Sequence, residues 1–486
     1  MKTIFEKSVP GRRGVRIVPS GVEREVPIKA ELLRDRPAEL PELSELDVVR
    51  HFTELSRKNF GVDTGFYPLG SCTMKYNPKA AERVAHYPGF AYLHPLVPQL
   101  AGGEMMVQGA LAVLYETGRL LGEICGMAQF TMQPLAGAHG ELTGVMIIAA
   151  YHADRGNEKT TILIPDSAHG TNPASAAIAG YQVRTVPSNA DGVMDVDALR
   201  EALDEKVAGL MLTCPNTLGL FNPRIKEIAD LIHSVDGLMY CDGANLNALL
   251  GRCRPGDVGF DIVHVNLHKT FATPHGGGGP GAGPVGVVEK LVAFLPTSVV
   301  CERDDGTYRL DYDRPKSIGY VAPFYGNFAI ILRAYAYLLM LGAEGLARVS
   351  ENAVLNANYV MAKLKGHYDL PVDRICKHEC VFSASRQAAR GVRALNVAKA
   401  LIDRGFHPPT VYFPLTVPEA MMIEPTETES KETLDAFVAA MIEIAELAES
   451  DPEKLLACPT TTPVGQLDET LAARKPDVAS LPAKDA

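Results

Sequence analysis

The sequence predicts an α/β protein with a mostly parallel sheet in a large domain and a smaller α+β domain near the C-terminus. The main observation is a regular alternation of short β-rich runs with helical patterns between residues 161 and 265. Such alternation is typical of parallel strands joined by helices that cover both faces of a sheet. At 486 residues the chain also exceeds one compact core, so two domains are expected.

Composition narrows the class of protein before any motif is considered. Apolar residues make up 47% and charged residues 22%, as in ordinary soluble proteins. The net charge of -11 argues against nucleic-acid binding, which needs a basic face. The N-terminus lacks the apolar core of a signal peptide, and no run reaches the roughly 18 apolar residues of a membrane helix. We therefore expect a cytoplasmic protein with reduced cysteines.

The N-terminal region is expected to hold an extended arm, two helices and a loop. Residues 1 to about 40 mix Pro, Arg and Glu without periodicity. A helix begins after Ser44, where Asp47 completes a capping box, and another runs from Val107 to Cys125 and ends at a glycine. The segment 65–78 between them is rich in Gly, Pro and small polar residues and is a candidate site loop.

The expected large sheet follows in chain order. A strand at 130–132 leads through a glycine turn into a helix over 145–151. The remaining elements are strands at 161–164 and 181–186, a helix at 196–203, a strand at 209–212, a helix at 225–233, and strands at 238–241 and 262–265. Ligands of such sheets bind at the carboxyl ends of the strands. Functional side chains are therefore expected directly after these strands.

The C-terminal part begins with a long helical pattern over 328–365, which suits a link between two domains. Strands at 381–383 and 410–413, helices at 392–403 and 434–447, and a charged tail from about residue 460 follow. We expect three parts: an N-terminal arm and helical extension with the site loop over 1–105, a large domain over 106–345, and a small α+β domain over 346–486.

Two polar residues at the ends of neighbouring strands point to a cofactor. Asp242 ends the apolar run at 238–241, where a carboxylate can pair with a protonated ring nitrogen. Lys269 follows the run at 262–265 and precedes a glycine-rich loop, a good position for a Schiff-base lysine. A surface lysine at a strand end is the plainer interpretation of Lys269 alone. Together the two residues predict bound pyridoxal phosphate.

Other residues at this edge fit the same cofactor. The run 137–140, between a strand and a helix, would point backbone amides at a phosphate group. His169 follows the strand at 161–164, where an imidazole can stack on a flat ring and move protons. The candidate cofactor contacts are Gly137, Ala138, His139, His169, Asn216, Thr217, Asp242, Ala244, His268 and Lys269, and the candidate catalytic residues among them are Lys269, His169 and Asp242.

One cluster raises the question of a metal. Cys376, His378 and Cys380 lie within five positions of one another and could supply ligands. A structural zinc usually takes four ligands, and no second cluster supplies the rest. We therefore expect no metal.

The longer motifs resemble the P-protein of the glycine cleavage system. The resemblance covers nearly the whole chain, and the length is similar to that of subunit 2, the β-type subunit, of the two-subunit form. The motifs that carry it are Gly70-Ser-Cys-Thr-Met-Lys75, Ala136-Gly-Ala-His-Gly-Glu141, Asp166-Ser-Ala-His-Gly-Thr-Asn-Pro173, Asn266-Leu-His-Lys-Thr270, Pro274-His-Gly-Gly-Gly-Gly-Pro-Gly281 and Met422-Ile-Glu-Pro-Thr-Glu427.

The resemblance implies a pyridoxal-phosphate-dependent glycine dehydrogenase (aminomethyl-transferring) with the aminotransferase-like fold, fold type I. By motif position, Lys269 would hold the cofactor covalently, Asp242 would hold its ring nitrogen, His169 would stack on the ring, and residues 137–139 would face the phosphate. Glycine would lose CO2 and its aminomethyl group would pass to the lipoyl arm of H-protein. Cys214 and Cys253 depart from the family pattern without removing a proposed catalytic group.

Partners and alternatives complete the expectations. The resemblance implies a P-protein subunit 1, in an α2β2 heterotetramer, and lipoylated H-protein. One alternative is another fold-type I enzyme, such as a cysteine desulfurase or an aminotransferase. Another is a catalytically silent scaffold subunit, which would not need Lys269. A nucleotide site at the glycine-rich loop is disfavoured because the Gly-x-Gly-x-x-Gly and acidic-residue order is absent.

Overall fold

The computed structural model describes residues 1–16, 18, 21, 28–36, 38–275 and 279–477. The chain divides into two compact units. One is Gly65–Gly465, and the other consists of Met1–Thr64 and Gln466–Ala486. All candidate cofactor contacts lie in the larger unit.

The smaller unit contains the helix α1 (Glu45–Ser56). The hydroxyl of Ser44 accepts the amide N–H of Asp47, and the carboxylate of Asp47 accepts the N–H of Ser44, so the predicted capping box is present. Two further short helices, η1 (Ala30–Leu32) and α15 (Glu469–Arg474), lie in segments expected to be irregular.

The large sheet has seven strands in the order β1-β7-β6-β5-β4-β2-β3. The strands are β1 (Gln129–Thr131), β2 (Thr161–Pro165), β3 (Gln182–Val186), β4 (Val207–Thr213), β5 (Leu238–Gly243), β6 (Ile262–Val265) and β7 (Val285–Val287). β7 is antiparallel to both of its neighbours, β1 and β6, and the pairs β2–β3, β2–β4, β4–β5 and β5–β6 are parallel. The prediction of a mostly parallel sheet is therefore confirmed.

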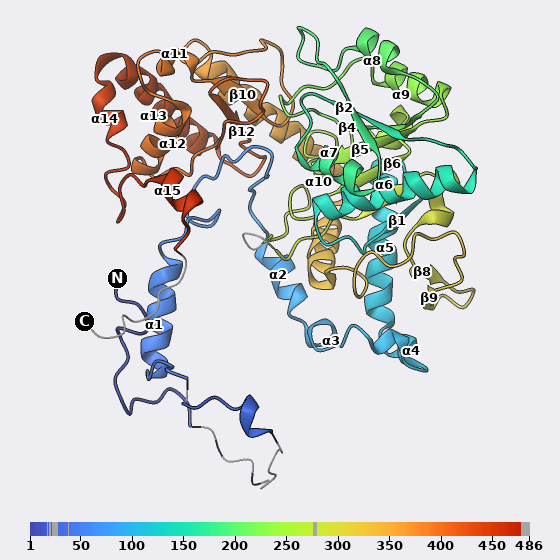
Figure 1. Ribbon diagram of the computed structural model, residues 1–486, viewed down its shortest axis with the longest axis horizontal. Helices are drawn as coiled ribbons and strands as arrows, with labels where there is room; N and C mark the ends of the chain where they lie inside the picture. The colour runs from blue at the N-terminus through green and yellow to red at the C-terminus, as the bar shows by residue number, and fades with distance from the viewer. Residues whose placement is uncertain (17, 19–20, 22–27, 37, 276–278, 478–486) are drawn as a thin grey trace. The chain divides into compact units, whose positions relative to one another are not determined.

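Helices cover both faces of this sheet, because successive residues of each buried strand point to opposite sides. Along β2, Leu163 packs in one core with α5, α8, α9 and α10, whereas Ile162 and Ile164 pack in a second core with α6 and α7. These helices are α5 (Gln108–Cys125), α6 (Gly137–Asp154), α7 (Thr171–Ile178), α8 (Val196–Ala202), α9 (Ile225–Ser234) and α10 (Phe328–Leu364). Figure 1 shows α6 running across the sheet in front of β5 and β6.

The helix α10 links the large sheet to the C-terminal part of the chain. It is long and apolar enough to cross a membrane by length and composition. Gly342 interrupts it with a φ of 61°, and its buried side chains belong to the protein core on both sides of that break. Within the most apolar 18-residue window of this helix, 39% of the residues are buried inside the protein.

A second sheet lies beyond α10. It has the antiparallel order β10-β12-β11, formed by β10 (Cys380–Ser383), β12 (Ala420–Ile423) and β11 (Thr410–Val411). Figure 1 shows its helices, α11 (Ser385–Ala388), α12 (Ala394–Asp403), α13 (Lys431–Ser450) and α14 (Pro452–Leu456), gathered around these strands. The register sets Cys380 opposite Ile423.

The remaining elements surround the end of the large sheet near β1. They are α2 (Lys79–Ala85), α3 (Pro88–Ala91), η2 (Val97–Gln99), α4 (Gly103–Met106), η3 (Pro255–Val258), η4 (Glu289–Phe294) and the hairpin β8 (Val299–Glu302) and β9 (Tyr308–Asp311). The sequence analysis did not predict α7, β7, β12 or this hairpin. These elements are short, and periodicity is a weak signal over so few residues.

Candidate active site

Asp242 lies near the carboxyl end of the fully buried strand β5. One carboxylate oxygen accepts the backbone N–H of Ala244 at 3.1 Å, and the other accepts the amide of Asn172 at 3.3 Å. Behind it, the Nε2 atom of His264 lies 3.4 Å away, and the Nδ1 atom of His264 contacts the hydroxyl of Tyr240 at 2.6 Å. The side chain is therefore fixed from behind by a chain of polar groups.

The charge of Asp242 follows from these contacts. Burial alone would raise its pKa, but the neighbouring imidazole of His264, the N–H of Ala244 and the nearby ammonium of Lys269 together hold the pKa below its usual value. Asp242 is thus a carboxylate at neutral pH, and it can accept a hydrogen bond from a protonated ring nitrogen.

Lys269 follows β6 in a turn, so its amine emerges at the same sheet edge as Asp242. Its Nζ atom donates a hydrogen bond to the carbonyl oxygen of Ser71 at 2.5 Å. Ser71 belongs to the candidate site loop at 65–78, so this loop reaches the sheet edge at Lys269. The next residue, Thr270, is fully buried and accepts the backbone N–H of Leu246, which anchors the turn.

The helix α6 begins at Gly137, earlier than the sequence analysis predicted, so the glycine run forms its first turn. No side chain caps this helix, whose N-cap residue is Ala136. A Cβ atom on Gly137 would lie 2.7 Å from the side-chain nitrogen of Asn266, so only glycine fits. Uncapped amides at the N-terminus of an 18-residue helix favour an anion.

A cavity of about 190 Å³ brings most of the candidate residues together. Gly137, Ala138, His169, Thr217, Asp242, Ala244 and Lys269 line it. The side chain of His169 contacts the hydroxyl of Thr171 through Nδ1 at 2.8 Å. Burial lowers the pKa of His169, so its imidazole is neutral at physiological pH.

Three candidates, His139, Asn216 and His268, do not line this cavity. His139 accepts the backbone N–H of Leu135, and Asn216 holds its own turn by accepting two backbone N–H groups. His268 accepts the N–H of Ala282, and burial together with Lys269 lowers its pKa to about 4. These side chains shape the loops around the site.

Several lining residues escaped the sequence analysis as individual candidates. Glu141, which follows the first turn of α6, accepts a hydrogen bond from the hydroxyl of Thr171 at 2.8 Å, and burial together with Asp242 raises the pKa of Glu141 to about 8. The others are Ser71, Thr171, Thr213, Pro215, Asn245, Asn266, His378 and Glu379. Glu141 and Asn266 stand inside motifs that were singled out, so the signal was present in the sequence.

The wall opposite the sheet edge comes from the C-terminal part of the chain. Glu379 precedes β10, and its carboxyl group accepts the backbone N–H of Ser71 at 3.0 Å. His378, Glu379 and Glu424 offer donor atoms that all lie within 4.8 Å of one another. The cluster at 376–380, considered above for a metal, thus faces the cavity through His378 and Glu379.

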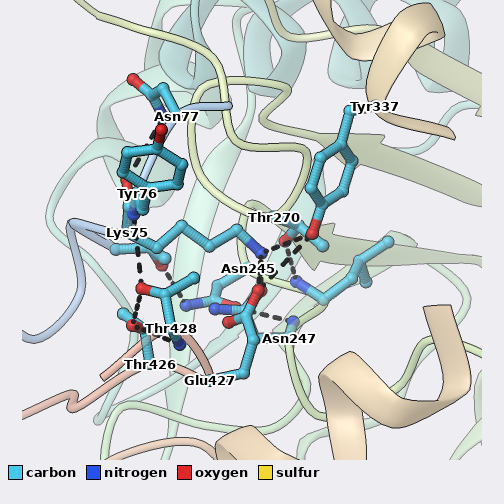
Figure 2. Close-up of polar contacts among 12 residues, drawn as sticks. Lys75, Tyr76, Asn77, Asn245, Asn247, Thr270, Tyr337, Thr426, Glu427 and Thr428 are labelled. Atoms are coloured by element: carbon cyan, nitrogen blue, oxygen red, sulfur yellow. Dashed lines mark hydrogen bonds and ion pairs between the residues drawn. The ribbon is translucent and has the colours of Figure 1, made fainter. Parts of the chain in front are cut away.

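Lys75, which belongs to the candidate site loop at 65–78, is buried in an ion pair. Its Nζ atom lies 2.8 Å from a carboxylate oxygen of Glu427 and donates to Asn247 at 3.2 Å (Figure 2). The hydroxyl of Tyr337 lies 3.4 Å from the same nitrogen. Burial alone would lower the pKa of Lys75, but Glu427 keeps it above its usual value. The site loop is therefore tied to the segment that follows β12.

The donor set of the cavity fits pyridoxal phosphate. Asp242 can accept from a protonated ring nitrogen, Lys269 supplies an amine, and the start of α6 supplies free amides for a phosphate. Two buried oxygens in the lining, Oδ1 of Asn266 and Oε2 of Glu141, have no hydrogen-bond partner within the described part of the chain. Such atoms indicate room for a polar ligand.

Family models and relatives agree with this chemistry. A model for the C-terminal domain of glycine dehydrogenase matches residues 349–455, and a model for class-V aminotransferases matches residues 140–278. The chain is 58% identical to the probable glycine dehydrogenase (decarboxylating) subunit 2 of Caldanaerobacter subterraneus subsp. tengcongensis over 477 residues, 97% of each chain. The corresponding protein of Bacillus licheniformis is also 58% identical, over 478 residues and 97% of each chain.

Solved structures confirm the fold. An inhibitor-bound glycine decarboxylase (P-protein) of the glycine cleavage system superposes with a TM-score of 0.70 at 22% identity, over 86% of this chain and 93% of that one. The glutamate decarboxylase of Lactobacillus brevis gives 0.65 at 12% identity, over 87% and 97%. The cysteine desulfurase of Escherichia coli gives 0.58 at 17% identity, over 79% and 96%. The fold is thus fold type I, as predicted.

The fold alone does not separate the alternatives, because the desulfurase shares it. Sequence identity near 58% over almost the full length does separate them. The relatives that match at this level are glycine dehydrogenases and neither desulfurases nor aminotransferases. The expected enzyme class and cofactor are confirmed with the family, since class-V aminotransferase domains and glycine dehydrogenases use pyridoxal phosphate. The chain belongs to the family of glycine dehydrogenase (decarboxylating) subunit 2.

Proposed function

We propose that this chain binds pyridoxal phosphate and decarboxylates glycine, and that the aminomethyl group passes to the lipoyl arm of H-protein. The observation that carries the proposal is the convergence of the Lys269 amine, the Asp242 carboxylate and the N-terminus of α6 on one cavity. The names of the relatives, glycine dehydrogenase (decarboxylating) subunit 2, support the same substrate.

Lys269 and Asp242 take the two central roles in this proposal. The amine of Lys269 is the point of covalent attachment, and the carbonyl of Ser71 orients it. The carboxylate of Asp242 holds a proton on the ring nitrogen, and Asn172 and Ala244 keep that carboxylate in place. The cofactor, when bound, supplies a sink for the electron pair left on carbon as CO2 departs.

The other candidate residues bind and orient the cofactor. The amides at Gly137 and Ala138 face the phosphate at the positive end of α6. His169, neutral because burial lowers its pKa, covers the flat ring without adding charge. Thr217 and Ala244 form the walls, whereas His139, Asn216 and His268 hold the surrounding loops.

We also propose the protein partners of this enzyme and its location in the cell. The name subunit 2 implies a partner subunit 1, and we propose an α2β2 heterotetramer to which lipoylated H-protein docks. We place the enzyme in the cytoplasm and keep the division into parts at 1–105, 106–345 and 346–486.

A borohydride experiment tests the site. Purified protein should show a visible absorption band that borohydride abolishes, and peptide mapping should find the pyridoxyl group on Lys269. Attachment to Lys75 or Lys290 would contradict the assignment, because Lys75 is engaged by Glu427 and Lys290 by Asp261.

An activity measurement tests the reaction and the partners. We expect exchange of labelled bicarbonate into glycine to be weak with this chain alone and to rise when subunit 1 and lipoylated H-protein are added. Full exchange with this chain and H-protein alone would show a self-sufficient enzyme. No exchange under any combination would remove glycine as the substrate.

A further inference from the structure

Two glutamates face each other in the cavity wall opposite the sheet edge. Glu379 directly precedes β10 and Glu424 directly follows β12. Because Cys380 pairs with Ile423 in the antiparallel register, the next residue pair outward is Glu379 and Glu424. Both side chains are buried, at 4% and 0% exposure, and their oxygens lie within 4.8 Å. Glu379 also lines the cavity beside Lys269.

The charge on this pair of carboxyl groups is not balanced by a directly bound lysine or arginine from the described residues. Within the described ranges, neither carboxyl group forms an ion pair with a lysine or arginine. The nearest buried lysine on the loop side, Lys75, is already paired with Glu427. Two buried like charges this close disfavour each other, so the pair holds one proton between its carboxyl groups at neutral pH.

Hydrogen bonds decide which carboxyl group is ionised. Asn247 accepts a hydrogen bond from the ammonium of Lys75 through Oδ1 (Figure 2). Its NH2 group therefore faces Glu424, to which it donates at 3.0 Å. Asn245 accepts the backbone N–H of Asn247 through Oδ1, so its NH2 group also faces Glu424, at 2.8 Å. The amide orientations are therefore determined by the network.

Both amide groups therefore donate to Oε1 of Glu424, and hydrogen bonds to this oxygen stabilise the carboxylate form. The hydroxyl of Thr73 contacts it as well, at 2.9 Å. Glu379, by contrast, accepts one N–H, from Ser71. Burial raises the pKa of Glu424 to about 7, against the hydrogen bonds that lower it, and burial together with Glu424 raises the pKa of Glu379 to about 8. The proton therefore resides on Glu379.

A metal ion is the other way to neutralise the pair, with His378 as a third ligand. Oε1 of Glu424 already accepts from Asn245, Asn247 and Thr73, which leaves only Oε2 of this carboxyl group for a cation. The titratable groups that face Glu379 are Glu424, Lys269, His378 and Cys376. The ammonium of Lys269 also disfavours a second cation nearby.

We propose that Glu379 is a carboxylic acid, kept protonated by Glu424, and that it donates its proton to the sulfur released when a disulfide acceptor takes the aminomethyl group. This step rests on the proposed function. A carbon–sulfur bond forms with the electron pair left by CO2, the sulfur–sulfur bond breaks, and its electron pair moves to the departing sulfur. The proton of Glu379 neutralises that sulfur as a thiol, and solvent restores the acid.

Infrared spectroscopy of the holoenzyme tests the protonation without relying on turnover. With glutamate labelled by carbon-13 in the side-chain carboxyl group, the carbonyl band of a protonated acid at pH 7 should weaken in Glu379→Gln relative to wild type. In Glu424→Gln the band of Glu379 should titrate at lower pH, because the like charge is gone. An unchanged band in Glu379→Gln would overturn the proposal, as would bound metal that is lost in that variant.

Kinetics tests the donor role. With a dithiolane disulfide as acceptor, Glu379→Gln should lower kcat on the order of 100-fold, the range of general acid catalysis, with glycine binding unchanged. Glu446→Gln, at an exposed position on α13, should match wild type. Wild-type kcat in Glu379→Gln would refute the donor role. If wild type itself releases no CO2 from glycine while the acid band is present, the proposed function fails and the protonated pair stands.

Discussion

Two walls of one cavity carry equally buried carboxyl groups that differ in charge. On the sheet wall, Asp242 is 5% exposed and its pKa is held below the usual value. On the opposite wall, Glu379 is 4% exposed and its pKa is raised to about 8. Burial is therefore not what distinguishes them. Asp242 accepts two hydrogen bonds and lies beside His264, which lowers its pKa, whereas Glu379 accepts one hydrogen bond and faces the carboxyl group of Glu424.

Because their neighbours differ, one cavity can hold a base and an acid at the same pH. Asp242 presents a fixed carboxylate to a protonated ring, and Glu379 stores a proton.

The largest effect is expected on the sheet wall. Lys269→Ala should remove covalent cofactor attachment and reduce CO2 release from glycine by more than about 1,000-fold, as loss of a covalent catalyst does. Lys290→Ala, which changes a lysine outside the cavity lining, should stay within a few-fold of wild type. Comparable losses in both variants would mean that Lys269 has no special role.

The opposite wall should depend on its buried ion pair for stability. Glu427→Gln leaves the ammonium of Lys75 buried without its partner and should lower the free energy of unfolding by about 3 kcal/mol. Glu344→Gln removes the exposed partner of Arg348 and should change it by less than about 0.5 kcal/mol. Urea unfolding monitored by circular dichroism measures the free energy of unfolding of both variants. Equal changes would argue that the ion pair between Lys75 and Glu427 does not stabilise the contact between the site loop and the C-terminal segment.

The charge of the sheet wall should matter for rate and little for folding. In Asp242→Asn an amide cannot hold the ring proton, so activity should fall on the order of 100-fold. Asp230→Asn, an exposed matched change, should leave the rate unaltered. Activity near wild type in the first variant would show that Asp242 is not the partner of the ring nitrogen.

The smallest effect concerns pH. The pKa of Glu379 rises from 4.5 to about 8 on folding, so between these values the folded state binds a proton that the unfolded state has lost. Stability from this group is full below about pH 4.5 and is lost as pH rises towards 8. The free energy of unfolding of wild type should thus fall more steeply over that window than that of Glu379→Gln. If the free energy of unfolding depends on pH in the same way in wild type and Glu379→Gln, Glu379 is ionised in the folded protein.

Much of the sheet wall could be predicted from the sequence. Asp242, Lys269 and His169 each follow a short apolar run, and parallel strands bring their carboxyl ends to one edge. The prediction was less exact for His139, Asn216 and His268, which share the right motifs but turn into the loops. Motif position indicates a neighbourhood, and the direction of a side chain depends on packing.

The opposite wall was decided by tertiary structure. The sequence by itself determined a parallel sheet, its edge and the cofactor chemistry there, because periodicity and strand ends are local properties. It did not predict β12, and without β12 nothing sets Glu424 against Glu379. Which amide faces which oxygen around Glu424 depends on Lys75, a residue remote in sequence. The charge of a buried group is set by the neighbours that folding brings to it, so only the folded chain fixes it.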